Sequence, residues 1–82
     1  MPHVLVKLWP GRTEEQKRAL TARIVDALKE TMGASDDYIT VGIEEVPAAD
    51  WPRQVYKPEI ADKRDRLYKK PGYGYSPEEL DG

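Results

Sequence analysis

Residues 4–9 read VLVKLW and residues 13–32 read TEEQKRALTARIVDALKETM. The first stretch is aliphatic and β-branched and stops at a Pro-Gly pair, which is typical of a strand. The second has apolar residues at helical spacing behind a capping box, in which Thr13 and Gln16 satisfy each other's backbone amides. The two stretches predict a strand followed by a helix that runs from residue 13 to residue 32.

A second strand is predicted after the helix. Gly33 suits the position just past a helix end, and residues 38–46 read YITVGIEEV before a proline. Within them Ile39, Val41 and Ile43 alternate with small or polar residues, as in a half-buried strand. Strand, long helix and strand in this order form a βαβ unit, whose strands run parallel with a right-handed crossover. The fold class we expect is therefore α/β, in the broad sense that includes α+β.

Two strands alone do not make a stable sheet in water, and their outer edges would stay unpaired. We therefore expect the 82-residue chain to be one domain that homo-oligomerisation completes into a four-stranded sheet with its helices on one face. The core would comprise residues 2–46 and the tail residues 47–82. In the tail, residues 58–68 are expected to form a short helix with Pro58 in its first turn, and residues 74–82 to fray unless they dock.

The composition argues against several classes of function. The sequence has no cysteine and one histidine, His3, which disfavours a metal site. With 13 basic and 15 acidic residues the net charge is −2, whereas nucleic-acid binding needs a basic excess. No apolar run approaches the roughly 20 residues of a membrane span, and no signal peptide is recognisable. We expect a cytoplasmic protein without metal, cofactor, membrane or nucleic-acid partner.

Three residues are candidates for chemistry. Met1 is generally removed before a residue as small as proline, which would turn Pro2 into an N-terminal secondary amine. Apolar surroundings and a nearby cation would lower the pKa of that amine towards neutrality, where a proton shuttle works best. Arg12, in the loop before the helix, could bind a substrate carboxylate through two hydrogen bonds, and Trp51 could wall an apolar pocket. Each has a plainer interpretation, as an ordinary chain start, a solvated loop arginine and a packing tryptophan.

Together these features resemble the 4-oxalocrotonate tautomerase family. The resemblance rests on Met1-Pro2 followed at once by a strand, on the run GRTEEQK at residues 11–17, and on the βαβ layout. It implies an isomerase that moves a proton between oxygen and carbon without a cofactor. In such an enzyme Pro2 would be the base and Arg12 would bind the substrate carboxylate.

The tail resembles one branch of this family. Trp51, the run EIA at residues 59–61 and the run KKPGY at residues 69–73 are similar to small bacterial tautomerases that are homodimers, and a dimer is therefore favoured over a hexamer. The resemblance also implies that Trp51 closes an apolar pocket, where the family has phenylalanine. At one position the chain departs from the family, because Thr40 aligns with a second arginine that polarises the 2-keto oxygen.

The sequence therefore predicts a keto–enol tautomerase for small 2-hydroxy-alkenoates and their 2-oxo tautomers. Two alternatives stay open at this point. A protonated Pro2 at the same site could assist hydration or dehalogenation of an unsaturated acid, with Glu44 or Asp50 activating water. The dimer could also be a binding module without activity, which the threonine at position 40 favours somewhat.

Overall fold

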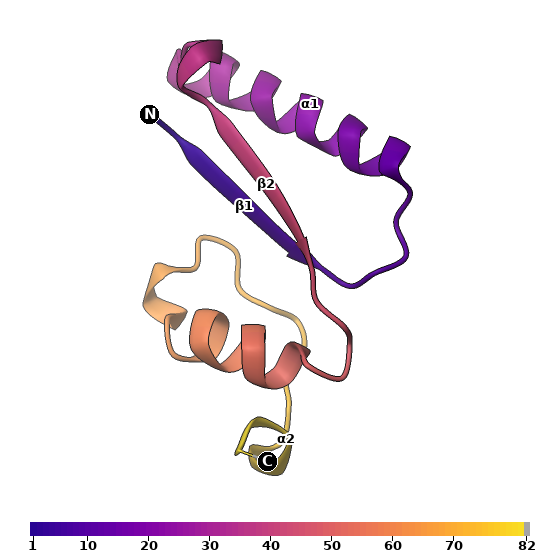
Figure 1. The fold of residues 1–82 in the computed structure, drawn as a ribbon. Coiled ribbons are helices and arrows are strands. Elements are labelled where there is room, and N and C mark those ends of the chain that lie inside the picture. Colours follow the sequence, from indigo (N-terminus) through magenta and orange to yellow (C-terminus); the bar gives the residue numbers. More distant parts are fainter. Residues whose placement is uncertain (82) are drawn as a thin grey trace. The chain divides into compact units, whose positions relative to one another are not determined.

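The first half of the chain is a βαβ unit. The computed structural model describes residues 1–81, and the chain divides into two compact units, of which Met1–Glu45 is the first. It contains β1 (His3–Leu8), α1 (Glu14–Met32) and β2 (Thr40–Glu45), and the two strands pair in parallel (Figure 1). The predicted order of elements and the parallel pairing are confirmed.

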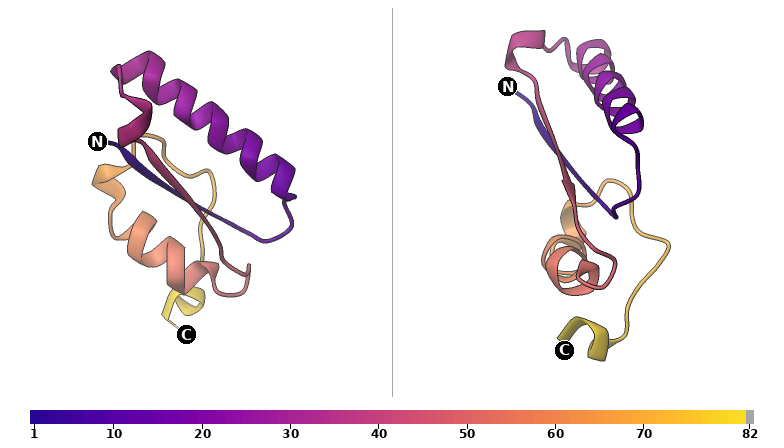
Figure 2. Two further views of the ribbon diagram at one scale, coloured as in Figure 1. Left: turned by 45° about the horizontal axis from the view of Figure 1, so that its top comes forward. Right: turned by 45° about the vertical axis from the view of Figure 1, so that its right-hand side comes forward.

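The register of the sheet separates two faces. It pairs His3 with Thr40 and Leu8 with Glu45, and side chains alternate across each strand. One face carries the side chains of Val4, Val6, Leu8, Val41, Ile43 and Glu45. This face is turned towards α1, because Val41 and Ile43 line a groove together with Thr21 of the helix, which lies along the sheet (Figure 2). The opposite face carries His3, Leu5, Lys7, Thr40, Gly42 and Glu44.

Both ends of α1 are determined by local sequence. The Gln16 amide donates to Thr13 Oγ1 at 3.0 Å, and the Thr13 amide donates to Gln16 Oε1 at 2.9 Å. At the other end Gly33 adopts a φ of 65°, and its amide donates to the Lys29 carbonyl at 3.0 Å. Glycine takes this left-handed conformation without the steric penalty of a side chain. The capping box and the glycine stop that the sequence predicts are both confirmed.

The bounds of both strands differ from those that the sequence patterns suggest. β1 begins one residue earlier than predicted and ends at Leu8. Tyr38, predicted to begin the second strand, instead belongs to the 3₁₀ turn η1 (Asp36–Tyr38), where its amide donates to the Ser35 carbonyl at 3.0 Å. Serine and aspartate favour such turns over extended backbone, so β2 starts only at Thr40.

The second unit, Val46–Gly82, corrects the predicted tail helix. A π-helix, η2 (Pro52–Ala61), replaces the helix expected over residues 58–68. The proline of its first turn is Pro52, and Pro58 lies inside it. In an α-helix the ring of an interior proline clashes with the carbonyl four residues earlier. The wider π turn, in which residues five apart are bonded, relieves this clash.

The rest of the second unit contains two short helical elements. A 3₁₀ turn, η3 (Arg64–Arg66), follows η2, and α2 (Pro77–Asp81) ends the described chain. The Ser76 amide donates to Glu79 Oε1 at 2.9 Å, and the Glu79 amide donates to Ser76 Oγ at 3.4 Å. Sequence reasoning passed over this capping box, which holds the turn at residues 77–81. The expectation that the end of the tail frays unless it docks stays a prediction. Gly82 lies outside the described residues.

Little of the first unit is shielded from solvent. No residue of α1 is buried, and its Leu20 and Met32 side chains are 38% and 62% exposed. On the sheet Leu5 is 48% exposed. Across residues 1–81 the buried side chains are Val46, Pro52, Val55 and Tyr56. The apolar stripe of α1 is thus formed as predicted, but within one chain it is only partly covered.

Candidate active site

Pro2 is the residue immediately before β1. Its carbonyl oxygen accepts a hydrogen bond from the Thr40 amide at 3.2 Å, so the last residue before β1 is tied to the first residue of β2. Pro2 is half-buried, whereas the preceding residue, Met1, is 96% exposed. The carbonyl side of Pro2 is therefore fixed, and its nitrogen side opens towards solvent.

Thr40, where the chain departs from the family pattern, contacts the residue that follows Pro2. His3 Nδ1 lies 2.6 Å from Thr40 Oγ1, on the sheet face turned away from α1. The pair joins residues 37 positions apart. Sequence reasoning missed it, because the contact depends on the register between two strands that are separated by a whole helix.

Arg12 lies at the other end of β1. Gly11 before it has a φ of 124°, a conformation that side chains rarely allow. The Arg12 side chain borders a groove of about 250 Å³ whose lining residues are Leu8, Arg12, Gln16, Lys17 and Leu20. Two of the lining residues are apolar leucines, and two, Arg12 and Lys17, are cationic. Such a lining can bind a small anion that has an apolar part.

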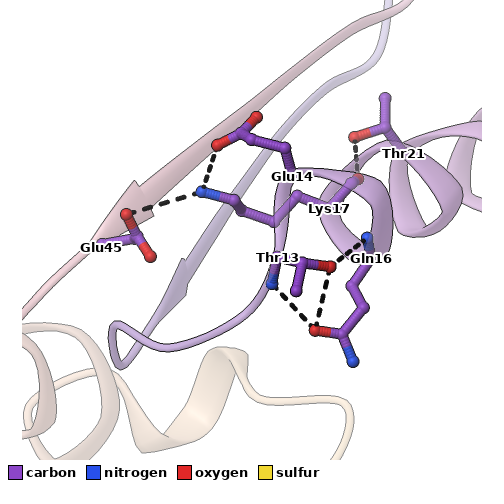
Figure 3. Close-up of polar contacts among 6 residues, drawn as sticks. All are labelled: Thr13, Glu14, Gln16, Lys17, Thr21 and Glu45. Atoms are coloured by element: carbon purple, nitrogen blue, oxygen red, sulfur yellow. Dashed lines mark hydrogen bonds and ion pairs between the residues drawn. The ribbon is translucent and has the colours of Figure 1, made fainter.

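The other cation of the groove is already neutralised. Lys17 Nζ lies 2.8 Å from Glu14 Oε1 and 3.6 Å from Glu45 Oε1 (Figure 3). The hydrogen bond between Lys17 and Glu14 raises the pKa of Lys17 and lowers the pKa of Glu14 from their ordinary values. Within residues 1–81, Arg12 takes part in no such ion pair or hydrogen bond. Arg12 is therefore the groove cation that remains available to an anionic ligand.

One chain does not bring Pro2 and Arg12 together. Pro2 precedes β1 and Arg12 follows it, so the two residues flank the strand at its opposite ends. At about 3.3 Å per strand residue, Pro2 and Leu8 are about 20 Å apart, and Arg12 follows Leu8. A small substrate held by both residues would need them from two copies of the chain.

Trp51 belongs to the second unit, just before η2. It is half-buried, and its amide hydrogen-bonds the carbonyls of Pro47 at 3.1 Å and Ala48 at 3.3 Å. The indole Nε1–H donates to the Tyr73 hydroxyl at 3.1 Å. The structure therefore gives the Trp51 side chain a specific partner, which the sequence pattern did not reveal.

Other sequence features find structural partners. Glu44, considered for water activation, pairs with Lys7 at 3.8 Å across the strands. Among residues 1–81 no three histidine, cysteine, aspartate or glutamate side chains cluster as a metal site would require. None of the helices in this part of the chain is both long and apolar enough to cross a membrane.

Comparison with known proteins identifies the family. The family model described as "Tautomerase enzyme" matches residues 2–58. The chain belongs to the tautomerase family. A probable tautomerase of Xylella fastidiosa is 40% identical to this tautomerase over 74 residues, which cover 90% of each chain. The 2-hydroxymuconate tautomerase of Bacillus subtilis is 54% identical over 46 residues, or 56% of this chain and 74% of the relative.

Solved structures place the tautomerase more closely. The crystal structure of YwhB, a homologue of 4-oxalocrotonate tautomerase, matches it with a TM-score of 0.55 and 52% sequence identity. The match covers 56% of this chain and 75% of that one. The resemblance to the 4-oxalocrotonate tautomerase family and the βαβ fold class are thus confirmed, and the tautomerase is an isomerase. These findings disfavour the binding module without activity.

Proposed function

We propose that this tautomerase interconverts the enol and keto forms of small 2-hydroxy-alkenoates and 2-oxo acids, with Pro2 as the general base. The observation that carries the proposal is the placement of Pro2. Its carbonyl is tied to Thr40 at 3.2 Å, while Met1 projects into solvent. Removal of Met1 leaves a secondary amine at a fixed position at the edge of the sheet.

The reaction needs one base and one proton. The Pro2 amine takes the hydroxyl proton of the enol, and the electrons of the O–H bond form the carbonyl. The electron pair of the C=C bond then takes the proton from the Pro2 ammonium at carbon, and the neutral amine returns. General acid–base catalysis of this kind contributes typically about 10²- to 10⁴-fold to a rate.

Arg12 is proposed to hold the substrate carboxylate. It is the unpaired cation of its groove, and a guanidinium binds a carboxylate through two parallel hydrogen bonds. Because β1 separates it from Pro2 of the same chain, the Arg12 that serves one Pro2 comes from a second copy. A homodimer would supply this second Arg12, and the tail resembles those of tautomerases that are homodimers. Trp51 would close the apolar side of the pocket. Homodimerisation and the cytoplasmic location stay predictions.

The deciding experiment compares two forms of one sequence. Native protein lacking Met1 and protein made with methionine aminopeptidase inhibited differ in the presence of Met1 and therefore in whether the Pro2 nitrogen is an amine or an amide. The activity is the exchange of C3 hydrogens of a 2-oxo acid with D₂O, followed by proton NMR. Exchange about 100-fold or more faster for the native form is expected, with intact mass reporting the state of Met1.

Substitutions separate Pro2 from other prolines. Pro2→Ala should slow exchange, whereas Pro10→Ala, in the exposed loop after β1, should leave it near the native rate. Alanine at the N-terminus is still an amine, so a partial loss is expected from that variant. Equal exchange rates for the Met1-retaining and Met1-free forms would rule out Pro2 as the base.

A further inference from the structure

The second unit folds so that Tyr73 lies beside Trp51, 22 residues earlier in the chain. The Trp51 Nε1–H donates to the Tyr73 hydroxyl at 3.1 Å. An indole nitrogen is a donor only, so this bond satisfies the one polar group of the Trp51 side chain. The family model ends at residue 58. The partner of Trp51 therefore comes from a segment outside the general family pattern.

Tyr73 is held in place by Tyr56 and Tyr75, and we call the three the tyrosine cluster. The ring centroids are 5.4 Å apart for Tyr56 and Tyr73, 5.9 Å for Tyr73 and Tyr75, and 5.1 Å for Tyr56 and Tyr75. The rings meet tilted or edge-on, which aromatic pairs prefer. Tyr56, on η2, is only 8% exposed, and its hydroxyl donates to the Tyr73 carbonyl at 3.5 Å. The Tyr73 ring thus has its own support, independent of Trp51.

The backbone alone does not determine where the indole points. The Trp51 amide is fixed by hydrogen bonds to the turn before it, but the side chain still rotates about two bonds. Among its allowed rotamers, the bond to Tyr73 favours the one that places Nε1 at the cluster. An aromatic wall contributes to binding only if it stays in contact with its ligand, because dispersion contacts weaken steeply with small gaps.

We propose that Tyr73 is a positioning residue, which fixes the Trp51 indole and thereby favours the binding of 2-oxo acids with an aryl group on C3. The inference rests on the proposed function, in which Trp51 walls the substrate pocket. Tyr73 touches no reacting atom. Its hydroxyl acts through the indole, so its loss changes binding of the aryl group and leaves proton transfer intact.

The test replaces the hydroxyl and keeps the ring. Tyr73→Phe is made in a Trp9→Phe background, where Trp51 is the only remaining tryptophan. Phenylpyruvate and 2-oxobutanoate serve as probes, because they differ only in a phenyl or methyl group on C3. We expect the Trp51 emission to shift, and KM for phenylpyruvate to rise roughly two- to tenfold, as for the loss of one neutral hydrogen bond. The kcat for both acids and KM for 2-oxobutanoate should stay unchanged.

Tyr68→Phe is the matched control. Tyr68 is 107% exposed, so loss of its hydroxyl should alter neither emission nor kinetics. An unchanged Trp51 emission in Tyr73→Phe would overturn the inference, as would an equal loss of kcat with both acids. A shifted emission with unchanged KM for phenylpyruvate would also overturn it, because Trp51 would then lie away from the substrate. Absence of C3 exchange in the parent protein would instead contradict the proposed function.

Discussion

Arg12 is the residue whose replacement best separates substrate binding from proton transfer. Its guanidinium is unpaired within residues 1–81, so Arg12→Gln should remove a charged hydrogen bond to the carboxylate. We expect KM to rise about tenfold or more with a smaller change in kcat. Arg12→Lys should recover only part of the binding, because it keeps the charge but loses the planar fork. Steady-state kinetics with a 2-oxo acid would measure both.

A second arginine provides the control for Arg12. Arg18 is exposed and lines a different groove, beside Thr21 and Val41. Arg18→Gln changes the net charge by the same amount, so it should leave KM within about twofold if general electrostatic attraction is weak at this ionic strength. Similar KM values for the Arg12 and Arg18 variants would argue against a specific role for Arg12.

At the site, the sequence suggests residues but not their partners. Pro2, Arg12 and Trp51 could be proposed from position and family resemblance, because each stands at a fixed distance from a readable element. The partner of Thr40 depends on strand register, and the bond from Trp51 to Tyr73 depends on the path of an irregular tail. Neither of these two contacts is marked by a sequence period or a motif, so they become visible only in the folded chain.

At the scale of the element, the start of α1 predicts a pH effect on stability. Glu14 has its pKa lowered from 4.5, mainly by the hydrogen bond from Lys17. Its pairing therefore stabilises the fold at pH above that ordinary value, and the contribution disappears as pH falls through the lowered pKa. Glu14→Gln should lower the melting temperature slightly at pH 7, and the difference from native should be smaller at a pH below 4.5. Thermal melts at the two pH values measure it.

Glu15→Gln is the control for Glu14. Both carboxylates lie in the first turn of α1 and interact alike with the helix dipole, but the Lys17 ion pair belongs to Glu14. Glu15→Gln should therefore show the smaller loss at pH 7. An equal loss in both variants would mean that the helix dipole, not the ion pair, accounts for the effect.

Elements with local signals were predictable, and elements without them were not. The Thr13 capping box and the Gly33 stop bound α1 within the sequence itself, so the structure agrees to a residue. In the tail the sequence predicts a helix starting at Pro58, but the helix starts at Pro52 and Pro58 lies inside it. A π-helix has no sequence period that would distinguish it from an α-helix, which explains why the prediction failed there.

At the scale of the whole molecule, a single chain leaves much of its apolar surface exposed to solvent. The sheet has two strands, and no side chain of α1 is buried. Two-stranded sheets are marginal in water, so a second copy is expected to cover these surfaces. The placement of Pro2 and Arg12 at opposite ends of β1 adds a functional reason, since a shared site would then join the two residues from different chains.

Mixing of two variants that are each impaired tests this shared site. Pro2→Ala and Arg12→Gln chains are co-refolded in equal amounts. If each site takes Pro2 from one copy and Arg12 from another, random assembly leaves about a quarter of the sites with both native residues, and activity should return towards a quarter of the native rate. If both residues of a site came from one chain, every site would lack one of them, and the mixture would stay as impaired as its components. Refolding each variant alone provides the baseline, and size-exclusion chromatography of the mixture establishes that assembly took place. Recovery would show that the proposed site is shared between two chains, as we expect from the placement of Pro2 before β1 and Arg12 after it.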